Sequence, residues 1–199
     1  FPEPPIGKYS NAGLLDIQMA VSRDGIKYHR LSRSPYIGLS PEGAKDSKTL
    51  YMAVGILREG NRLLQYYIGY DYPHGEPEAE RSRAGALCCA VQRLDGFVSA
   101  DAAYCGGEIR TPKIQFEGSH LTLNVDTSAL GSVRVGILDE GGKEISEYSV
   151  DKCEVIHGNF IDHTVTWKGH SDLSSLIGKP IRLHFVMRSA KLYAFQFVG

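Results

Sequence analysis

The sequence is poor in the features that would place it in several large classes of protein. It has no run of about 18–20 apolar residues, the length that a membrane-spanning helix requires. Its 22 Lys and Arg residues are balanced by 23 Asp and Glu residues, and the net charge is −1. Proteins that bind nucleic acid normally carry a basic patch, and no segment here is strongly basic. We therefore expect neither a membrane nor a nucleic-acid partner.

Cysteine is scarce, and its spacing excludes the common metal motifs. The four cysteines are Cys88, Cys89, Cys105 and Cys153, and none forms a C-x-x-C pair. Cys88 and Cys89 adjoin in an apolar segment, where neighbouring side chains of a strand point to opposite faces. The sequence therefore predicts four reduced, mostly buried thiols and no metal site. It also lacks a phosphate-binding glycine loop and a nucleophile elbow, so we expect no cofactor.

What the sequence does contain is alternation of apolar and polar residues, most regularly in residues 161–198. Segment 180–188 places four apolar residues on one side, Ile181, Leu183, Phe185 and Met187. In the next segment the aromatic residues Tyr193, Phe195 and Phe197 recur at every second position. Successive side chains of a strand leave opposite faces, so each segment predicts a strand with one apolar side to bury.

The same alternation predicts an all-β chain. We expect strands at 14–22, 26–31, 49–57, 62–70, 84–93, 97–100, 111–116, 120–126, 132–138, in a stretch near 148–156, and in the three closing segments. One helical turn is expected at 171–177. Because residues 63–70 are almost all apolar or aromatic, they predict a sheet covered on both faces. The short, regular strands after residue 107 favour an antiparallel β-sandwich, jelly-roll-like, over residues 101–199.

A sequence pattern that occurs twice suggests a second kind of architecture for residues 1–100. AVSRDGIKYHRL at 20–31 and AVQRLDGFVSAD at 90–101 both combine a strand, an Asp-Gly turn and a short strand. Four-stranded units repeated along a chain are typical of propeller blades. Two unrelated hairpins that share common turn residues would give the same pattern, and both interpretations stay open. We describe residues 1–100 as partial propeller-like strands.

Four segments together resemble one family: SRDG at 22–25, YYIGYDYPHG at 66–75, AVQRLDGFVSADA at 90–102, and the closing TVTWKGHSDLSSLIGKPIRLHFVMRSAKLYAFQF at 164–197. They resemble the C-terminal part of bacterial glycoside-hydrolase-like proteins. These combine a five-bladed β-propeller, related to arabinanases and fructan hydrolases, with a C-terminal β-sandwich. The resemblance implies a role in carbohydrate processing. A periplasmic or secreted location stays open.

Residues 1–100 supply too few strands for a propeller ring, and incomplete rings leave unpaired strand edges. Because the sequence begins with Phe1 rather than Met, we expect further residues upstream. The expected partners are therefore carbohydrate, and either upstream propeller blades or another copy of the chain. A structural sandwich that shields a propeller edge and binds nothing is the alternative.

Hydrolysis of a glycosidic bond normally needs two carboxyl groups. The candidates beside predicted strands are Asp16, Asp46 and Asp71. Asp46, in AKDSKTLY, resembles a Trp-Asp-Ser step of the family, but Lys45 stands where the tryptophan would be. The resemblance also implies that the catalytic acids come largely from earlier blades. We therefore expect this chain alone not to hydrolyse glycosides, and turn or capping roles are the alternative for the three carboxylates.

The loop after the predicted strand at 62–70 is the strongest candidate for a binding site. Tyrosine and histidine rings can stack on a sugar ring, while carboxylate and guanidinium groups bond its hydroxyls. An exposed loop that meets only water is the alternative. Together with Asp46, the predicted substrate-binding residues are Tyr70, Asp71, Tyr72, His74 and Arg83.

The second half also contains a group of possible ligands, His157, Asp162, His163, His170 and Asp172. Their spacing matches no metal motif. His163 shares a strand face with Val165 and Trp167, so a core position is expected for it. Trp167 is the only tryptophan, and its apolar neighbours favour a core role over that of a sugar-stacking platform.

Overall fold

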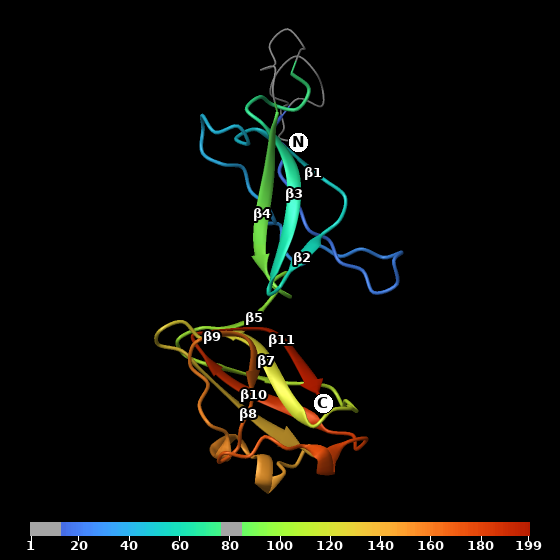
Figure 1. The fold of residues 1–199 in the computed structure, drawn as a ribbon, viewed down its shortest axis with the longest axis vertical. Helices are drawn as coiled ribbons and strands as arrows, with labels where there is room; N and C mark the ends of the chain where they lie inside the picture. Colours follow the sequence, from blue (N-terminus) through green and yellow to red (C-terminus); the bar gives the residue numbers. More distant parts are fainter. Residues whose placement is uncertain (1–12, 77–84) are drawn as a thin grey trace. The chain divides into compact units, whose positions relative to one another are not determined.

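The computed structural model describes residues 13–76 and 85–199. In these residues all strands pair antiparallel into three sheets, and the only helical pieces are short 3-10 turns. The all-β prediction is confirmed. The described residues form neither a propeller nor a closed barrel, and they contain no helix long and apolar enough to cross a membrane. The chain divides into two compact units, Phe1–Arg93 and Leu94–Gly199 (Figure 1). The predicted division after residue 100 stays a prediction.

The first unit contains one four-stranded sheet. Its strands are β1 (Thr49–Met52), β2 (Leu57–Glu59), β3 (Arg62–Tyr70) and β4 (Ala86–Arg93). Strand β3 is central, with β1 and β2 following each other along one edge and β4 along the other (Figure 1). The predicted strand at 49–57 is therefore interrupted. Gly55 has a φ of 96°, a left-handed conformation that glycine adopts readily and that an extended strand cannot contain.

The two faces of this sheet differ sharply. In β3 the side chains of Leu63, Gln65 and Tyr67 are buried, whereas Tyr66 and Ile68 are exposed. Residues 13–48 contact the first face, where the Tyr36 hydroxyl accepts a hydrogen bond of 2.6 Å from the Gln65 amide. Among the described residues the prediction that both faces are covered was wrong, because Tyr66 and Ile68 on the second face are exposed.

The segments predicted as strands at 14–22 and 26–31 form isolated bridges instead. Leu15 pairs with Thr49, Ile17 with Ile37, and Val21 with His29. Between Val21 and His29, the Asp24 carboxylate accepts hydrogen bonds from the backbone N–H groups of Ile26 and Lys27 at 2.9 and 2.8 Å. A side chain that takes these donors competes with a strand ladder, which explains why the pairing stays local.

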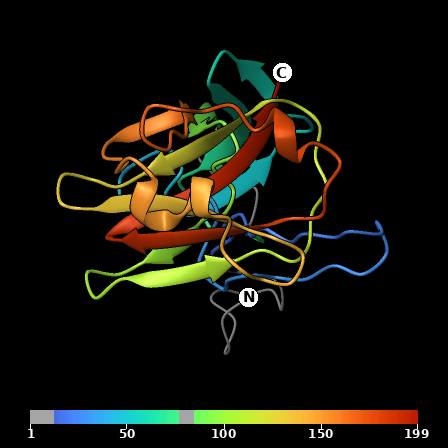
Figure 2. The same cartoon turned by 90° about the horizontal axis from the view of Figure 1, so that it is seen from below.

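The second unit consists of two sheets on either side of one core. The first has the order β5 (Ala100–Ala102), β11 (Ala190–Val198), β7 (His120–Asp126) and β9 (Asn159–Thr164), and the second β6 (Gly107–Arg110), β10 (Arg182–Arg188) and β8 (Ser132–Leu138). Figure 1 and Figure 2 show both layers. The second copy of the repeated pattern, at 90–101, therefore does not form a hairpin, because β4 and β5 belong to different sheets.

The core of the second unit confirms the alternation read from the sequence except in the last segment, where a register shift leaves Phe195 exposed. The strands predicted at 120–126 and 132–138 match β7 and β8, and the closing segments form β9, β10 and β11. The predicted inward residues are buried, namely Leu121, Leu123, Val125, Val133, Val135, Ile137, Ile181, Leu183, Phe185 and Met187. Trp167 is also buried, and its indole N–H donates to the Val135 carbonyl at 2.8 Å. Its predicted core role is confirmed.

Three predictions for this unit need correction. Residues 111–116 contribute a single bridge, between Ile114 and Ile181, rather than a strand. The stretch near 148–156 forms the 3-10 turns η2 (Ser146–Tyr148) and η3 (Val150–Lys152) rather than a strand. By contrast, the helical turn expected at 171–177 is confirmed as the 3-10 turn η4 (Ser174–Leu176). The short strand expected at 97–100 lies instead at Ala100–Ala102.

Candidate functional site

The loop that follows β3 is fastened to its surroundings at several points. The Thr49 hydroxyl on β1 donates to the Tyr72 carbonyl at 2.8 Å. The backbone of His74 exchanges two hydrogen bonds with that of Gly13, at 2.8 and 3.1 Å. The Tyr70 carbonyl accepts from the Lys48 N–H at 3.1 Å. These bonds hold both ends of the loop against β1 and the segment before it.

The fastened loop and the adjacent strands enclose a pocket of about 310 Å³. The lining residues, called here the tyrosine pocket, are Thr49, Tyr51, Tyr70, Tyr72, Pro73, His74 and Gly75. The Tyr51 and Tyr70 rings meet edge to face at 6.1 Å, and the Tyr70 and Tyr72 rings lie 5.0 Å apart. The Tyr51 hydroxyl is 2.6 Å from Nδ1 of His74. The pocket therefore combines aromatic surfaces with hydroxyl and imidazole groups.

Three of the predicted site residues, Tyr70, Tyr72 and His74, lie together in this pocket. Tyr51 and Thr49 were missed by the sequence analysis. They join the pocket because β1 pairs antiparallel with β3, opposing Thr49 to Tyr70 and Tyr51 to Ile68. Directly opposed residues share a sheet face, so only the register of the two strands could have identified them.

The predicted carboxylates lie outside the lining. Asp71 forms an ion pair with Lys45, with Nζ and Oδ2 2.7 Å apart. Asp46 accepts a hydrogen bond of 2.9 Å from the Tyr67 hydroxyl, on the face of β3 opposite Tyr70. Asp16 accepts from the Gln18 amide at 2.7 Å. Among the described residues that line the pocket there is no carboxylate, and hence no acid pair for hydrolysis. Arg83 lies outside the described residues.

The contact between Asp46 and β3 is close. A Cβ atom at Gly69 would lie 2.3 Å from the Asp46 Cβ and 2.7 Å from its Cα. Burial raises the pKa of the Tyr67 hydroxyl, and the hydrogen bond and charge of Asp46 raise it further. Tyr67 therefore stays protonated and donates to the carboxylate. This arrangement joins the segment before β1 to the covered face of the sheet.

The histidines of the second unit are held by separate partners. A ring nitrogen of His157 lies 2.7 Å from the Gly131 carbonyl oxygen, and the His163 ring packs 4.6 Å from that of Phe160. Burial lowers the pKa of His163, but its side chain is only half-buried and does not belong to the core, so the predicted core position was wrong. The Asp172 carboxylate accepts the Ser174 N–H at 2.9 Å. Over residues 13–76 and 85–199, no three His, Cys, Asp or Glu side chains are placed to hold a metal ion.

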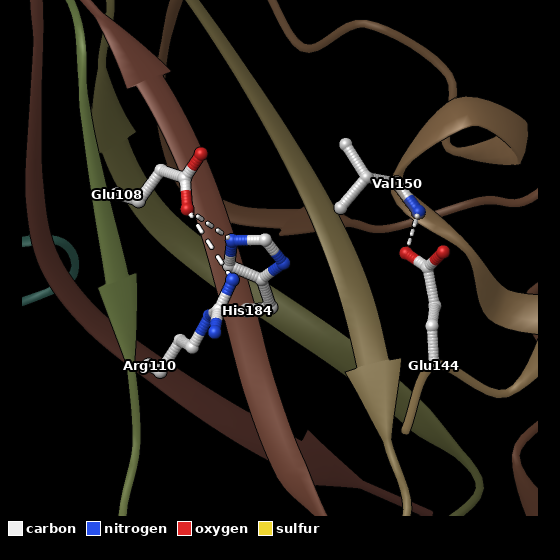
Figure 3. A network of polar contacts seen from close by, with 5 residues as sticks. All are labelled: Glu108, Arg110, Glu144, Val150 and His184. Carbon is white, nitrogen blue, oxygen red and sulfur yellow. Dashed lines mark hydrogen bonds and ion pairs between the residues drawn. The ribbon is translucent and has the colours of Figure 1, made fainter. Parts of the chain in front are cut away.

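A polar network lies on one face of the β6–β10–β8 sheet. Glu108 on β6 contacts Nε2 of His184 on β10 at 2.9 Å and the Arg110 guanidinium at 3.6 Å. Close to it, a Glu144 carboxylate oxygen accepts the Val150 N–H at 2.8 Å (Figure 3). The first contact joins an edge strand to its central neighbour, and the second fixes the start of η3. Both contacts are explained by the fold.

A smaller cleft of about 190 Å³ lies where β5 meets β11. Its lining includes Asp101, Asp126, Ser128 and Lys191. The Lys191 ammonium pairs with Asp101, and this hydrogen bond is the main cause that holds the pKa of the Asp101 carboxyl below its ordinary value. The Asp126 carboxylate accepts the Ser128 N–H at 2.8 Å. Both carboxylates of the cleft therefore already have partners within the protein.

The cysteines depart in part from expectation. All four are free thiols, and Cys88 and Cys89 lie on opposite faces of β4 as predicted. However, only Cys153 is buried, whereas Cys89 and Cys105 are exposed. The prediction of mostly buried thiols was wrong. Cys89 is exposed because it lies on the uncovered face of the sheet, directly opposite Tyr66.

Comparison with known proteins finds no protein-family model, no curated protein and no solved structure that matches this chain. The assignment of function therefore depends on the geometry of the tyrosine pocket.

Proposed function

We propose that this chain binds carbohydrate in the tyrosine pocket and does not hydrolyse glycosidic bonds by itself. The single observation that carries the proposal is the grouping of three tyrosines and a histidine around one cavity, with no lining carboxylate among the described residues. Tyrosine rings offer apolar faces to the C–H groups of a sugar ring. The Tyr51 hydroxyl and the His74 imidazole supply hydrogen-bonding groups for its hydroxyls.

The size of the pocket supports a small ligand. Its volume of about 310 Å³ lies at the lower end of the range of about 300–1,000 Å³ that is usual for ligand sites. A cavity of this size suits one sugar ring or the end of an oligosaccharide. Because the lining residues come from β1, from the end of β3 and from the fastened loop, the site is largely formed before a ligand arrives.

The positions of the described carboxylates support the proposal that the chain does not hydrolyse glycosides. Acid and nucleophile or base must flank one glycosidic bond, about 5–9.5 Å apart. Asp71 is neutralised by Lys45, and Asp46 lies on the other face of β3, where it accepts from Tyr67. Neither is placed to share a ligand with the other in the tyrosine pocket.

The proposal extends to the biological setting. We propose that the chain is the C-terminal portion of a glycoside-hydrolase-like protein, with partial propeller-like strands before a jelly-roll-like sandwich. Support comes from the family resemblance of segments 66–75 and 164–197 and from the antiparallel sheets of both units. In this setting the tyrosine pocket would retain a glycan while other residues perform the chemistry.

The test is binding to a glycan array, followed by calorimetry with the best ligand. We expect the protein to bind without releasing reducing sugar, and Tyr72→Ala to weaken binding by about tenfold or more because a ring that lines the pocket is lost. Tyr28→Ala is the matched control, since Tyr28 is exposed in the same unit but outside the pocket. An equal effect of both variants, or no glycan bound at all, would contradict the proposal. If the protein hydrolyses glycosides and Asp46→Asn or Asp71→Asn abolishes that activity, the protein is an enzyme and the proposal is wrong.

A further inference from the structure

The uncovered face of the first sheet exposes a continuous group of apolar side chains. The pairing register places these side chains on one face, here called the open face, and they are Leu57, Leu64, Tyr66, Ile68, Leu87, Cys89 and Val91. Leu87 is 74% exposed, and Leu57 and Val91 are each 59% exposed. On the covered face Leu63 is only 8% exposed. A contiguous apolar surface of this kind usually marks an interaction site.

The chemistry of the open face excludes a charged or strongly polar partner over most of its length. Between Arg62 at one end of β3 and Tyr70 at the other, its side chains on β3 and β4 carry no charge. Charges gather at the first end, where Glu59 and Arg93 both oppose Arg62. The second end is aromatic, because Tyr51 and Tyr70 lie there. The face therefore has a net cationic end, an apolar centre and an aromatic end.

The open face of one copy is complementary to the open face of a second copy when the two run in opposite directions. Tyr66 lies midway between Arg62 and Tyr70, so a two-fold axis that passes beside Tyr66, across the strands, sets the Arg62 of each copy over the Tyr70 of the other. Leu64 then meets Ile68 of the second copy. An axis along the strands would instead set Arg62 against Arg62, which like charges disfavour. The antiparallel arrangement is the one that pairs guanidinium groups with tyrosine rings.

We propose that the open face binds the open face of a second copy of this chain, with the strands of the two sheets running in opposite directions. Two sheets pack face to face at about 10 Å, with their apolar side chains interleaved. The association removes Leu57, Leu87 and Val91 from water, which is the main favourable contribution. It also places Arg62 of the second copy beside Tyr70, at the edge of the tyrosine pocket. The dimer does not depend on the pocket having a ligand.

The first test is the oligomeric state of the full chain at several protein concentrations, measured by sedimentation velocity. We expect a monomer–dimer equilibrium, which Leu87→Glu shifts toward monomer by at least about tenfold in the dissociation constant, because the dimer would bury an unpaired carboxylate. Leu130→Glu is the matched control, since Leu130 is 79% exposed and belongs to the second unit rather than to the open face. Both residues are exposed in the monomer, so neither charge should disturb folding.

The second test uses the native thiols. In the antiparallel arrangement Cys89 lies close to the two-fold axis, because it is directly opposite Tyr66. A bismaleimide with a span of about 10 Å, the distance between packed sheets, should link two copies through Cys89. We expect covalent dimers from the Cys105→Ser protein and none from Cys89→Ser, although Cys105 is exposed too. The two variants thus serve as controls for each other.

Three results would overturn the proposal. A chain that stays monomeric at every concentration has no such interface. Equal weakening by Leu87→Glu and Leu130→Glu would place the contact elsewhere. Cross-linking that survives Cys89→Ser and is lost in Cys105→Ser would assign the dimer to the second unit. Loss of glycan binding in Tyr72→Ala with an unchanged dimer would leave this inference standing, so the two proposals fail separately.

Discussion

The hydroxyl oxygen of Tyr51 lies 2.6 Å from Nδ1 of His74, joining strand β1 to the loop that follows β3. The two rings also meet at 6.1 Å with an interplanar angle of 63°. Each ring therefore restricts the orientation of the other in the tyrosine pocket. Preorganised side chains lose less conformational entropy when a ligand binds, so this pair should matter for affinity more than its single hydrogen bond suggests.

Replacing Tyr51 with phenylalanine tests this relationship. Tyr51→Phe keeps the ring but removes the hydroxyl, and we expect glycan affinity to fall about 2–10-fold, the equivalent of one hydrogen bond. Calorimetry measures the affinity, and circular dichroism checks that the fold is unchanged. Tyr66→Phe, an exposed position on the open face, is the control and should bind as the wild type does. Unchanged affinity in Tyr51→Phe would remove this hydrogen bond from the site.

A glycine on the covered face should be intolerant of any side chain. At Gly69 a Cβ atom would come within 2.3 Å of the Asp46 Cβ, and the backbone Cα at 2.7 Å prevents a simple side-chain rotation from relieving the clash. We expect Gly69→Ala to lower the free energy of unfolding by about 1–3 kcal/mol, as overpacking of a filled site does. Urea denaturation measures the change.

The control for this variant is Gly38→Ala. A Cβ atom there would meet nothing nearer than the Pro35 Cβ at 3.8 Å, an ordinary van der Waals distance. Its stability should stay close to that of the wild type. If Gly38→Ala and Gly69→Ala destabilise the protein alike, the close approach of Asp46 to β3 is not the cause.

His163 should make the stability of the protein depend on pH. Burial lowers its pKa below the ordinary value of 6.5, so the unfolded chain binds a proton at this ring at higher pH than the folded chain does. Stability rises with pH wherever the unfolded state binds more protons. We therefore expect the free energy of unfolding to fall as the pH drops through 6.5, and to level off below the lowered pKa of the folded state.

The difference between His163→Gln and the wild type isolates this contribution from the other histidines. His163→Gln should show a shallower fall in the free energy of unfolding between neutral pH and the folded-state pKa. His29→Gln, at an exposed position, should follow the wild-type curve. Parallel curves for wild type and His163→Gln would show that the ring is not desolvated in solution.

The thiols should react in an order set by their exposure. Cys89 and Cys105 are exposed and should modify rapidly with a thiol reagent, whereas Cys153 should resist until the protein unfolds. Burial raises the pKa of the Cys153 thiol, which reduces the reactive thiolate. Mass spectrometry of labelled peptides measures the order. Early labelling of Cys153 would contradict the core position beside Val135.

Strand positions in the second unit were predictable because their alternation is regular and their core is complete. Val133, Val135 and Ile137 follow each other at every second position, and all are fully buried. The bulge in β11 was not predictable. It lies between Leu192 and Ala194 and places both Leu192 and Phe195, three positions apart, opposite the core residues of β7. A bulge inserts one residue into the ladder and so breaks the period of two.

The first unit was harder to predict for a physical reason. Whether Tyr66 and Ile68 are covered depends on where residues 13–48 pass, and local alternation holds no information on that path. The tyrosine pocket was half predictable. Tyr70, Tyr72 and His74 are close in sequence, whereas Tyr51 enters through strand register. Asp46 was predicted to bind substrate, but it accepts a hydrogen bond from Tyr67 instead. Tyr67 lies on the face of β3 opposite Tyr70, so Asp46 is outside the pocket.

The open face of the first sheet also has a consequence for aggregation of the protein. Residues 63–70 contain no charge and no proline, and β4, within the described part of the chain, pairs along one edge only. Uncharged segments of six or seven residues with high strand propensity are those that stack into amyloid fibrils. A monomer released from the proposed dimer therefore exposes both the unpaired edge of β4 and the apolar side chains of the open face. Heating a concentrated sample should therefore begin fibril growth at β3 and β4.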